Sequence, residues 1–158
     1  MERRRKHQSH RPPQNPCCRI KIYNRQSNLR IDCSSVRKLI LFFLQQKKIS
    51  NQGVAIYFVG IRKITQLHAQ YFNDPTPTDC ITFPLNDQLL GEIFVCPKAA
   101  LDYNPKKPYE ETTLYIIHGL LHLLGYDDID NKKRARMRRE EKRLIALAKK
   151  HRCILRSA

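Results

Sequence analysis

Two histidines four residues apart stand in a stretch of the sequence that is rich in apolar residues. His118 and His122 lie within residues 109–124, which we predict to be a helix with apolar side chains on most faces. Residues four apart on a helix face the same way, so both imidazoles could reach one metal ion. A lone histidine there is more simply a hydrogen-bonded core residue, but burying two costs a desolvation that a metal ion would offset. The pair therefore indicates a metal site.

The residues after this helix offer a third ligand. Gly125 lets the chain leave the helix in a left-handed turn, so that Asp127 or Asp128 can swing back toward the histidines. The run from His118 to Asp128 reads H-x-x-x-H-x-x-G-x-x-D, the spacing of a metzincin zinc site with a carboxylate ligand, which favours Asp128 over Asp127. The other interpretation is that Asp128 caps the next helix, a role also open to Asp127 and Asp130. We expect one Zn²⁺ per chain.

The expected ligand set suggests a reaction class. Three protein ligands leave one zinc position open for water, which is typical of a catalytic site and favours hydrolysis. A metalloprotease needs the glutamate of H-E-x-x-H as its general base, but Gly119 occupies that position. The net charge of +16 also suits a phosphodiester substrate better than a peptide. An oxygen-activating iron site is allowed by the ligands, but nothing else points to it.

The positive charge lies at the two ends of the chain. Residues 1–25 hold 8 basic and 1 acidic residue, residues 26–129 hold 10 of each, and residues 130–158 hold 12 and 3. Basic segments around a neutral middle favour a polyanion, and RNA or DNA is the leading partner. The alternatives are a solvated tail and helix face, or an acidic membrane surface. The predicted nucleic-acid contacts open the last helix: Lys132, Lys133, Arg134 and Arg136.

The hydrophobic pattern predicts a single compact α/β (α+β) domain, with about four strands in a mixed sheet packed with helices. The histidine helix is expected to be central. Expected strands cover residues 19–23, 54–60, 80–83 and 92–96, with a turn at 84–91, and expected helices cover 34–48, 61–72, 109–124 and 130–149. Residues 1–17 are predicted to be a disordered basic extension, 18–150 the domain, and 151–158 a flexible tail.

The composition of the sequence indicates the cellular compartment. The longest apolar run, residues 39–44, is far shorter than the ~20 residues of a transmembrane helix, and residues 1–16 lack the apolar part of a signal peptide. The six cysteines form no C-x-x-C pair and are assigned no function. We therefore expect a cytoplasmic protein without a membrane partner.

With these motifs in view, the chain resembles the YbeY family of metal-dependent bacterial endoribonucleases. The segment His118-Gly-Leu-Leu-His-Leu-Leu-Gly-Tyr-Asp127 is similar to the family's H-G-x-L-H-L-x-G-Y-D-H pattern. Blocks at Leu67–Tyr71, Pro77–Asp79, Thr82–Pro84 and Leu90–Ile93 follow the family's order upstream, and Met137, Glu140 and Glu141 follow downstream. The resemblance spans about residues 20–145. It implies a zinc ion in a cleft and cleavage of single-stranded RNA in the 3′-end maturation and quality control of small-subunit ribosomal RNA.

The sequence departs from the family pattern at two positions. The third metal ligand of the family is usually histidine, whereas Asp128 stands here. A basic arginine usually follows the family's L-N-x-x-Y block, whereas Phe72 follows Tyr71, so Arg62, Lys63 or His68 substitutes for it or activity is reduced. The alternative to a nuclease is a non-catalytic RNA-binding ribosome-assembly factor with a structural metal. A third interpretation is a hydrolase of small phosphoesters or peptides.

Overall fold

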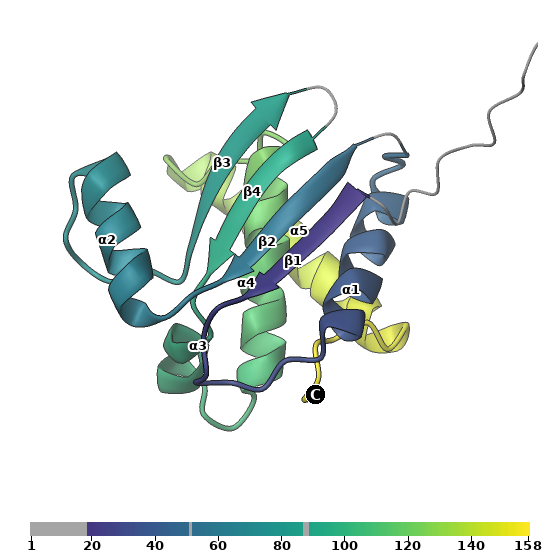
Figure 1. Ribbon diagram of the computed structural model, residues 1–158. Coiled ribbons are helices and arrows are strands. Elements are labelled where there is room, and N and C mark those ends of the chain that lie inside the picture. Colours follow the sequence, from purple (N-terminus) through teal and green to yellow (C-terminus); the bar gives the residue numbers. More distant parts are fainter. Residues whose placement is uncertain (1–18, 51, 87–88) are drawn as a thin grey trace, which may run out of the picture.

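The fold is built on one four-stranded mixed sheet (Figure 1). The computed structural model describes residues 19–50, 52–86 and 89–158. Its strands are β1 (Ile20–Asn24), β2 (Gly53–Phe58), β3 (Cys80–Asn86) and β4 (Leu89–Val95). The order across the sheet is β1-β2-β4-β3, with β1, β2 and β4 parallel and β3 antiparallel to β4. The predicted α/β class with a four-stranded mixed sheet is confirmed.

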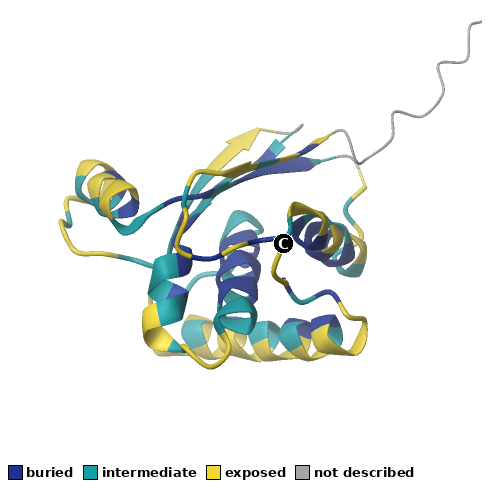
Figure 2. Ribbon diagram, turned by 60° about the horizontal axis from the view of Figure 1, so that its bottom comes forward, coloured by how far each residue is buried: buried dark blue, intermediate teal, exposed yellow. Residues whose placement is uncertain are grey.

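Three helices lie on one face of this sheet: α1 (Cys33–Gln46), α4 (Pro108–Leu123) and α5 (Asn131–Lys150). Figure 2 shows α4 directly against the sheet and α5 in a further layer beneath it. The central position predicted for the histidine helix is therefore confirmed. Within the described ranges, no helix has both the length and the apolar character that crossing a bilayer requires.

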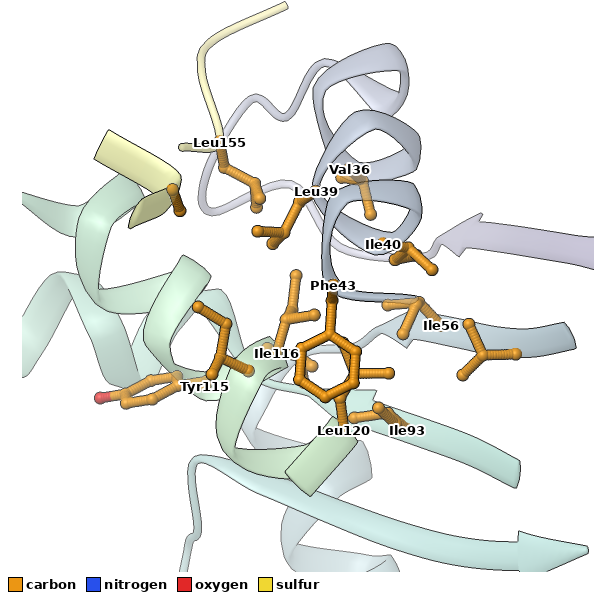
Figure 3. Close-up of a cluster of buried hydrophobic side chains, with 14 of the residues drawn as sticks. Val36, Leu39, Ile40, Phe43, Ile56, Ile93, Tyr115, Ile116, Leu120 and Leu155 are labelled. Atoms are coloured by element: carbon orange, nitrogen blue, oxygen red, sulfur yellow. The ribbon is translucent and has the colours of Figure 1, made fainter. Parts of the chain in front are cut away.

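The core forms where α1 and α4 meet the inner face of the sheet. Ile116 and Leu120 of α4 pack with Phe43 of α1 and with Ile56 and Ile93 of the central strands, and none of these side chains is exposed (Figure 3). Burial of each such side chain contributes about 1.5–3 kcal/mol relative to leaving it in water. This packing fixes the rotation of α4 about its axis, and with it the direction in which the histidines point.

The opposite face of the sheet is covered in a different way. Helix α2 (Ile61–Phe72) packs there through Ile64 and Leu67, next to β3. Beyond α2, the rings of Tyr23, Tyr57 and Phe94 stack side by side across β1, β2 and β4, with centroids 4.8 and 4.6 Å apart. The aromatic row shields apolar surface that no helix covers on this face.

Two features of the middle of the chain differ from the sequence prediction. The seven-residue helix α3 (Pro97–Tyr103) was not predicted. The turn expected at residues 84–91 is mostly strand, because β3 continues to Asn86 and β4 begins at Leu89. Pro84 is accommodated since β3 is an edge strand, where a residue without a backbone N–H is tolerated.

The end of the chain is packed rather than free. Cys153 and Leu155 are buried in the core cluster, and the backbone N–H of Leu155 donates to Thr113 Oγ1 at 3.0 Å. Arg156 binds Asp32 twice, through its carbonyl oxygen at 3.0 Å and its Nε at 2.8 Å. The flexible tail expected at 151–158 is thus seen as a segment joining α1 to α4, since two apolar side chains anchor it. The expected extension at 1–17 lies outside the described residues.

Candidate metal centre

Helix α4 presents the two histidines on one edge. It begins with Pro108 at its first turn, where a residue without N–H costs nothing, and Glu110 and Glu111 complement the positive end of the helix dipole. At the other end, His118 and His122 are half-buried and their Nε2 atoms lie 3.1 Å apart. Both nitrogens therefore face one point, as their spacing predicts.

A Schellman turn brings the following residues back to this point. Gly125 has φ +90°, its N–H donates to the carbonyl of His122, and the N–H of Tyr126 donates to the carbonyl of Leu121, each at 3.0 Å. Asp128 then approaches His122, with Oδ1 3.9 Å from Nε2. The left-handed turn predicted at Gly125 is confirmed, and a residue with a Cβ would be strained there.

One carboxylate of the Asp-Asp pair faces the histidines and the other holds the turn. Ligand atoms of His118, His122 and Asp128 all lie within 4.8 Å of one another. Asp127 Oδ1 instead accepts hydrogen bonds from the N–H groups of Asp128 at 2.7 Å and Ile129 at 3.2 Å. Two imidazole nitrogens and one carboxylate oxygen form a donor set that zinc and other transition metals accept, so this group could hold a metal ion.

Glu141 on α5 orients the first histidine. Its Oε1 lies 2.5 Å from His118 Nδ1. Because a carboxylate only accepts, the imidazole proton lies on Nδ1, which leaves the lone pair of Nε2 directed at the site. Burial lowers the pKa of His118, but the hydrogen bond and charge of Glu141 outweigh it and the net shift is upward. Sequence reasoning missed this role, although Glu141 lies four residues after the core residue Met137 and so shares its face of α5.

A charged cavity opens beside His118 and Asp128, with a volume of about 340 Å³. Arg134 and Arg138, one turn apart on α5, contribute its positive charge, and four carboxylates contribute negative charge. The full lining is Asp79, Tyr103, Glu111, Leu114, Tyr115, His118, Asp128, Arg134, Met137, Arg138 and Glu141. Burial raises the pKa of Glu111 above its ordinary value. The cavity therefore places guanidinium groups next to the candidate metal ligands.

The four predicted nucleic-acid contacts take different positions around this cavity. Arg134 lines it. Arg136 instead lies over the ring of Tyr126, with its Cζ 4.9 Å from the centroid. Lys133 lies 3.9 Å from Asp130, which caps α5, and Lys132 is exposed. Arg138, which was not among the four, is the second arginine of the cavity.

A second cavity, of about 270 Å³, lies on the other side of His118. No Lys, Arg, Asp or Glu lines it, and we call it the neutral cavity. Its lining is His68, Phe72, Cys80, Ile81, Thr82, His118 and His122. Of the three residues considered as substitutes for the family arginine, His68 alone lines this cavity. Arg62 lines a separate groove, and Lys63 is exposed and lines neither the charged cavity nor the neutral one.

The close packing of α4 on the sheet explains why residue 119 is a glycine. A Cβ at this position would lie 2.8 Å from Ile93 Cγ2 and 3.2 Å from Thr82 Cγ2, because the helix packs directly onto β3 and β4 here. A glutamate at 119 would point into the sheet and not toward the histidines. The position is therefore fixed by packing between helix and sheet, and the general base of a metalloprotease is excluded from it.

Together, the sheet and the site define a class: a small α/β protein whose buried helix and following turn offer two histidines and a carboxylate at a cleft with basic residues. The chain belongs to the YbeY family, whose model, described as endoribonuclease YbeY, matches residues 21–149. The predicted resemblance is confirmed.

Relatives named endoribonuclease YbeY match most of the chain. The one from Protochlamydia amoebophila is 41% identical over 140 residues, covering 83% of this chain and 93% of the relative. The one from Chlamydia trachomatis serovar D is 37% identical over 150 residues, covering 88% and 93%. A solved structure, the solution structure of TM1509 from Thermotoga maritima, has a TM-score of 0.55 and 28% identity, and the match covers 80% of this chain and 86% of that one.

Proposed function

We propose that this protein is a zinc-dependent endoribonuclease that hydrolyses phosphodiester bonds in single-stranded RNA. The observation that carries the proposal is the convergence of ligand atoms from His118, His122 and Asp128 beside a cavity that holds two arginines. The relatives' name, endoribonuclease, supports the same reaction. The nuclease domain would comprise residues 18–150, with the packed C-terminal segment completing its core.

Each part of the site has a role in this reaction. His118, His122 and Asp128 would hold one Zn²⁺ per chain, and Glu141 would keep His118 in the ligating tautomer. When bound, zinc in a three-ligand site lowers the pKa of water and polarises an oxygen of the substrate. Arg134 would neutralise a phosphate that enters the charged cavity. Lys132, Lys133 and Arg136 would contact the phosphates of RNA that extends along α5.

The proposed substrate is ribosomal RNA, with the 3′ end of the small-subunit RNA as the site of maturation and the small ribosomal subunit as a further partner. The family resemblance supports this choice, and so does the basic excess in residues 1–25 and 130–158, which suits a large polyanion. A protein with this substrate would work in the cytoplasm, without a membrane partner.

Elemental analysis and a cleavage assay on the same preparation test the proposal. We expect about one zinc per chain and cleavage of a labelled single-stranded oligoribonucleotide. A His118→Ala/His122→Ala variant that folds should lose both. His151→Ala is the matched control, because His151 lies against Phe42 outside both cavities beside the metal centre. Undiminished cleavage by the double variant would refute the proposed site.

One observation favours the second candidate, an RNA-binding assembly factor with a structural metal. Phe72 stands where the family usually has arginine, and the neutral cavity has no other basic residue than histidine to contact a phosphate. This candidate predicts stoichiometric zinc and RNA binding without turnover. The same two assays separate it from the nuclease.

A further inference from the structure

The neutral cavity has the chemistry of a nucleobase site. It is lined by Cys80, Ile81 and Thr82 of β3, by three histidines and by Phe72. A phosphate would find no lysine or arginine there, whereas an aromatic base would find an apolar and weakly polar surface. The charged cavity, with its two arginines, offers the complementary environment on the other side of His118.

Phe72 is the part of this cavity that is available for stacking. It lies in the last turn of α2 and is 55% exposed. Its ring centroid is 5.7 Å from that of His68, one turn earlier, and the two planes are tilted by 51°. Much of the Phe72 side chain is therefore uncovered, and it lines the same cavity as both histidines of the candidate metal centre.

The end of α2 holds this ring in place. Asn73 ends the helix in the left-handed conformation, with φ 54°, and its N–H donates to the carbonyl of Ala69 at 3.1 Å. His68 Nδ1 donates to the carbonyl of Thr76 at 2.8 Å, and the N–H of Thr76 donates to Asp74 Oδ1 at 2.9 Å. These bonds tie the following loop back to the helix, so the Phe72 backbone is fixed relative to the cavity.

We propose that the neutral cavity binds one unpaired nucleobase of the RNA substrate, which stacks on the ring of Phe72. The proposal rests on the proposed function in one respect, that RNA lies across the candidate metal centre. Since both cavities border His118, a strand whose phosphate is held on the Arg134 side places an adjacent nucleotide on the Phe72 side. Phe72 then contributes base contact in place of the phosphate contact of an arginine.

This subsite would select for single strands. In a duplex, both faces of each base are covered by its neighbours, so a base can stack on a protein ring only after it leaves the helix. A base in a single strand makes this contact without that cost. Phe72 would thus be a specificity-determining residue.

Binding of labelled oligoribonucleotides to three variants at position 72 tests the proposal. Phe72→Ala removes the ring, Phe72→Leu keeps apolar surface without a π face, and Phe72→Trp keeps and enlarges the π face. Leu85→Ala is the control, because Leu85 is 52% exposed on β3 and lines neither cavity. Fluorescence anisotropy in rapid mixing at 4 °C, with a single strand and a matched duplex, gives each Kd before turnover.

We expect Phe72→Ala and Phe72→Leu to weaken single-strand binding by about tenfold, the usual size of one base–aromatic contact. Phe72→Trp should bind at least as tightly as the native protein, and duplex binding should not change in any variant. Equal single-strand affinity in Phe72→Ala would overturn the proposal. So would full retention in Phe72→Leu, because that result assigns the contact to apolar area and not to stacking.

An abasic nucleotide locates the base. If one base occupies the cavity, an abasic residue at one position near the cleaved bond weakens binding to the native protein by the same factor as Phe72→Ala, and the two losses do not add. Additive losses at every position would overturn the proposal. Cleavage measured in parallel distinguishes failure of the base site from failure of the nuclease. If the Phe72 variants bind more weakly but the native protein does not cleave RNA, the nuclease is refuted and the base site is supported. If the native protein cleaves RNA but changes at position 72 do not affect binding, the nuclease is supported and the base site is refuted.

Discussion

At the scale of single residues, the two neighbouring aspartates have different surroundings and should have different functions. Asp128 completes the group of ligand atoms with His118 and His122, while Asp127 accepts two backbone hydrogen bonds. We expect Asp128→Ala to lose bound zinc, because two ligands hold the ion more weakly than three. Asp127→Ala should retain zinc but lose stability by about 1 kcal/mol through its turn bonds.

Elemental analysis of the two dialysed variants measures their zinc content, and urea unfolding measures their stability. The assignment of the third ligand fails if Asp127→Ala loses the metal while Asp128→Ala keeps it.

Glu141 acts through His118 and is a positioning residue. Replacing it with glutamine removes the charge that holds the Nδ1 proton and lets the side-chain amide rotate to donate instead, which would favour the wrong tautomer. We expect Glu141→Gln to reduce zinc affinity by about 10- to 100-fold.

Competition with a zinc-binding dye measures this affinity. Asp102→Asn is a suitable control, because Asp102 is an exposed carboxylate that pairs with Lys98 and does not line the cavity. A Kd for zinc equal to that of the native protein would show that Glu141 does not orient the ligand.

At the scale of elements, α4 approaches the sheet as closely as a glycine permits. A methyl group at Gly119 would meet Ile93 Cγ2 at 2.8 Å, which is closer than carbon atoms pack. In Gly119→Ala, the overpacking should therefore cost about 1–3 kcal/mol of stability. The higher helix propensity of alanine offsets ~1 kcal/mol of this cost. The urea midpoint tests the sign: a midpoint above that of the native protein would mean that the helix shifts without cost.

A charged brace joins α1, α5 and the turn that carries Asp128. Lys47, the residue that caps the C-terminal end of α1, binds Glu140 on α5 at 2.6 Å and the hydroxyl of Tyr126 at 3.3 Å, while Arg143 binds Glu140 at 2.5 Å. The Arg143 hydrogen bonds, followed by those of Lys47, lower the pKa of Glu140 to about 2. The brace is thus formed while Glu140 is ionised.

The contribution of this brace to the stability of the protein decreases as the pH falls. A carboxylate with a depressed folded-state pKa stabilises the protein fully above its unfolded pKa, ~4.3, and this stabilisation is lost as the pH falls toward 2. We expect Glu140→Gln to cost up to about 3 kcal/mol at pH 7, and the difference from the native protein to shrink below about pH 4.5. Urea unfolding of both proteins from pH 7 to 3 measures this difference in stability. A difference that is constant across this range would contradict the assignment.

The sequence predicts those parts of the site that depend on local geometry. The spacing of His118, His122 and Gly125 is fixed by one helix and its turn, so the pattern indicates where they point. The contact of Glu141 with His118 joins residues 23 apart, and only the packing of α5 on α4 creates it. Likewise, nothing local shows that Leu155 returns to the core, and α3 is too short for a periodic pattern.

At the scale of the whole molecule, the charge is divided between a neutral middle and basic ends. Residues 26–129 carry no net charge, whereas residues 130–158 hold 12 basic and 3 acidic residues. Most of these basic residues lie on α5, the outer layer of the helical face (Figure 2). RNA bound at the cleft would extend over this layer, and its affinity should fall steeply with salt as counterions are released.

The arginines of the cleft should contribute a defined part of that salt dependence. Arg134 and Arg138 line the charged cavity, whereas Arg139, the next residue along α5, is exposed and does not line it. If each cavity arginine neutralises one phosphate, the Arg134→Ala/Arg138→Ala variant should lower the slope of log K against log salt concentration by about 1.4, since a single-stranded contact accounts for ~0.7. Arg139→Ala changes the net charge without removing a cavity contact, so its slope should stay close to the native one. Titrations of a single-stranded oligoribonucleotide between low and physiological salt give both slopes. Equal slopes for the two variants would mean that RNA responds to the overall charge of α5 and not to the cleft, because a diffuse field does not distinguish the position of an arginine along the helix.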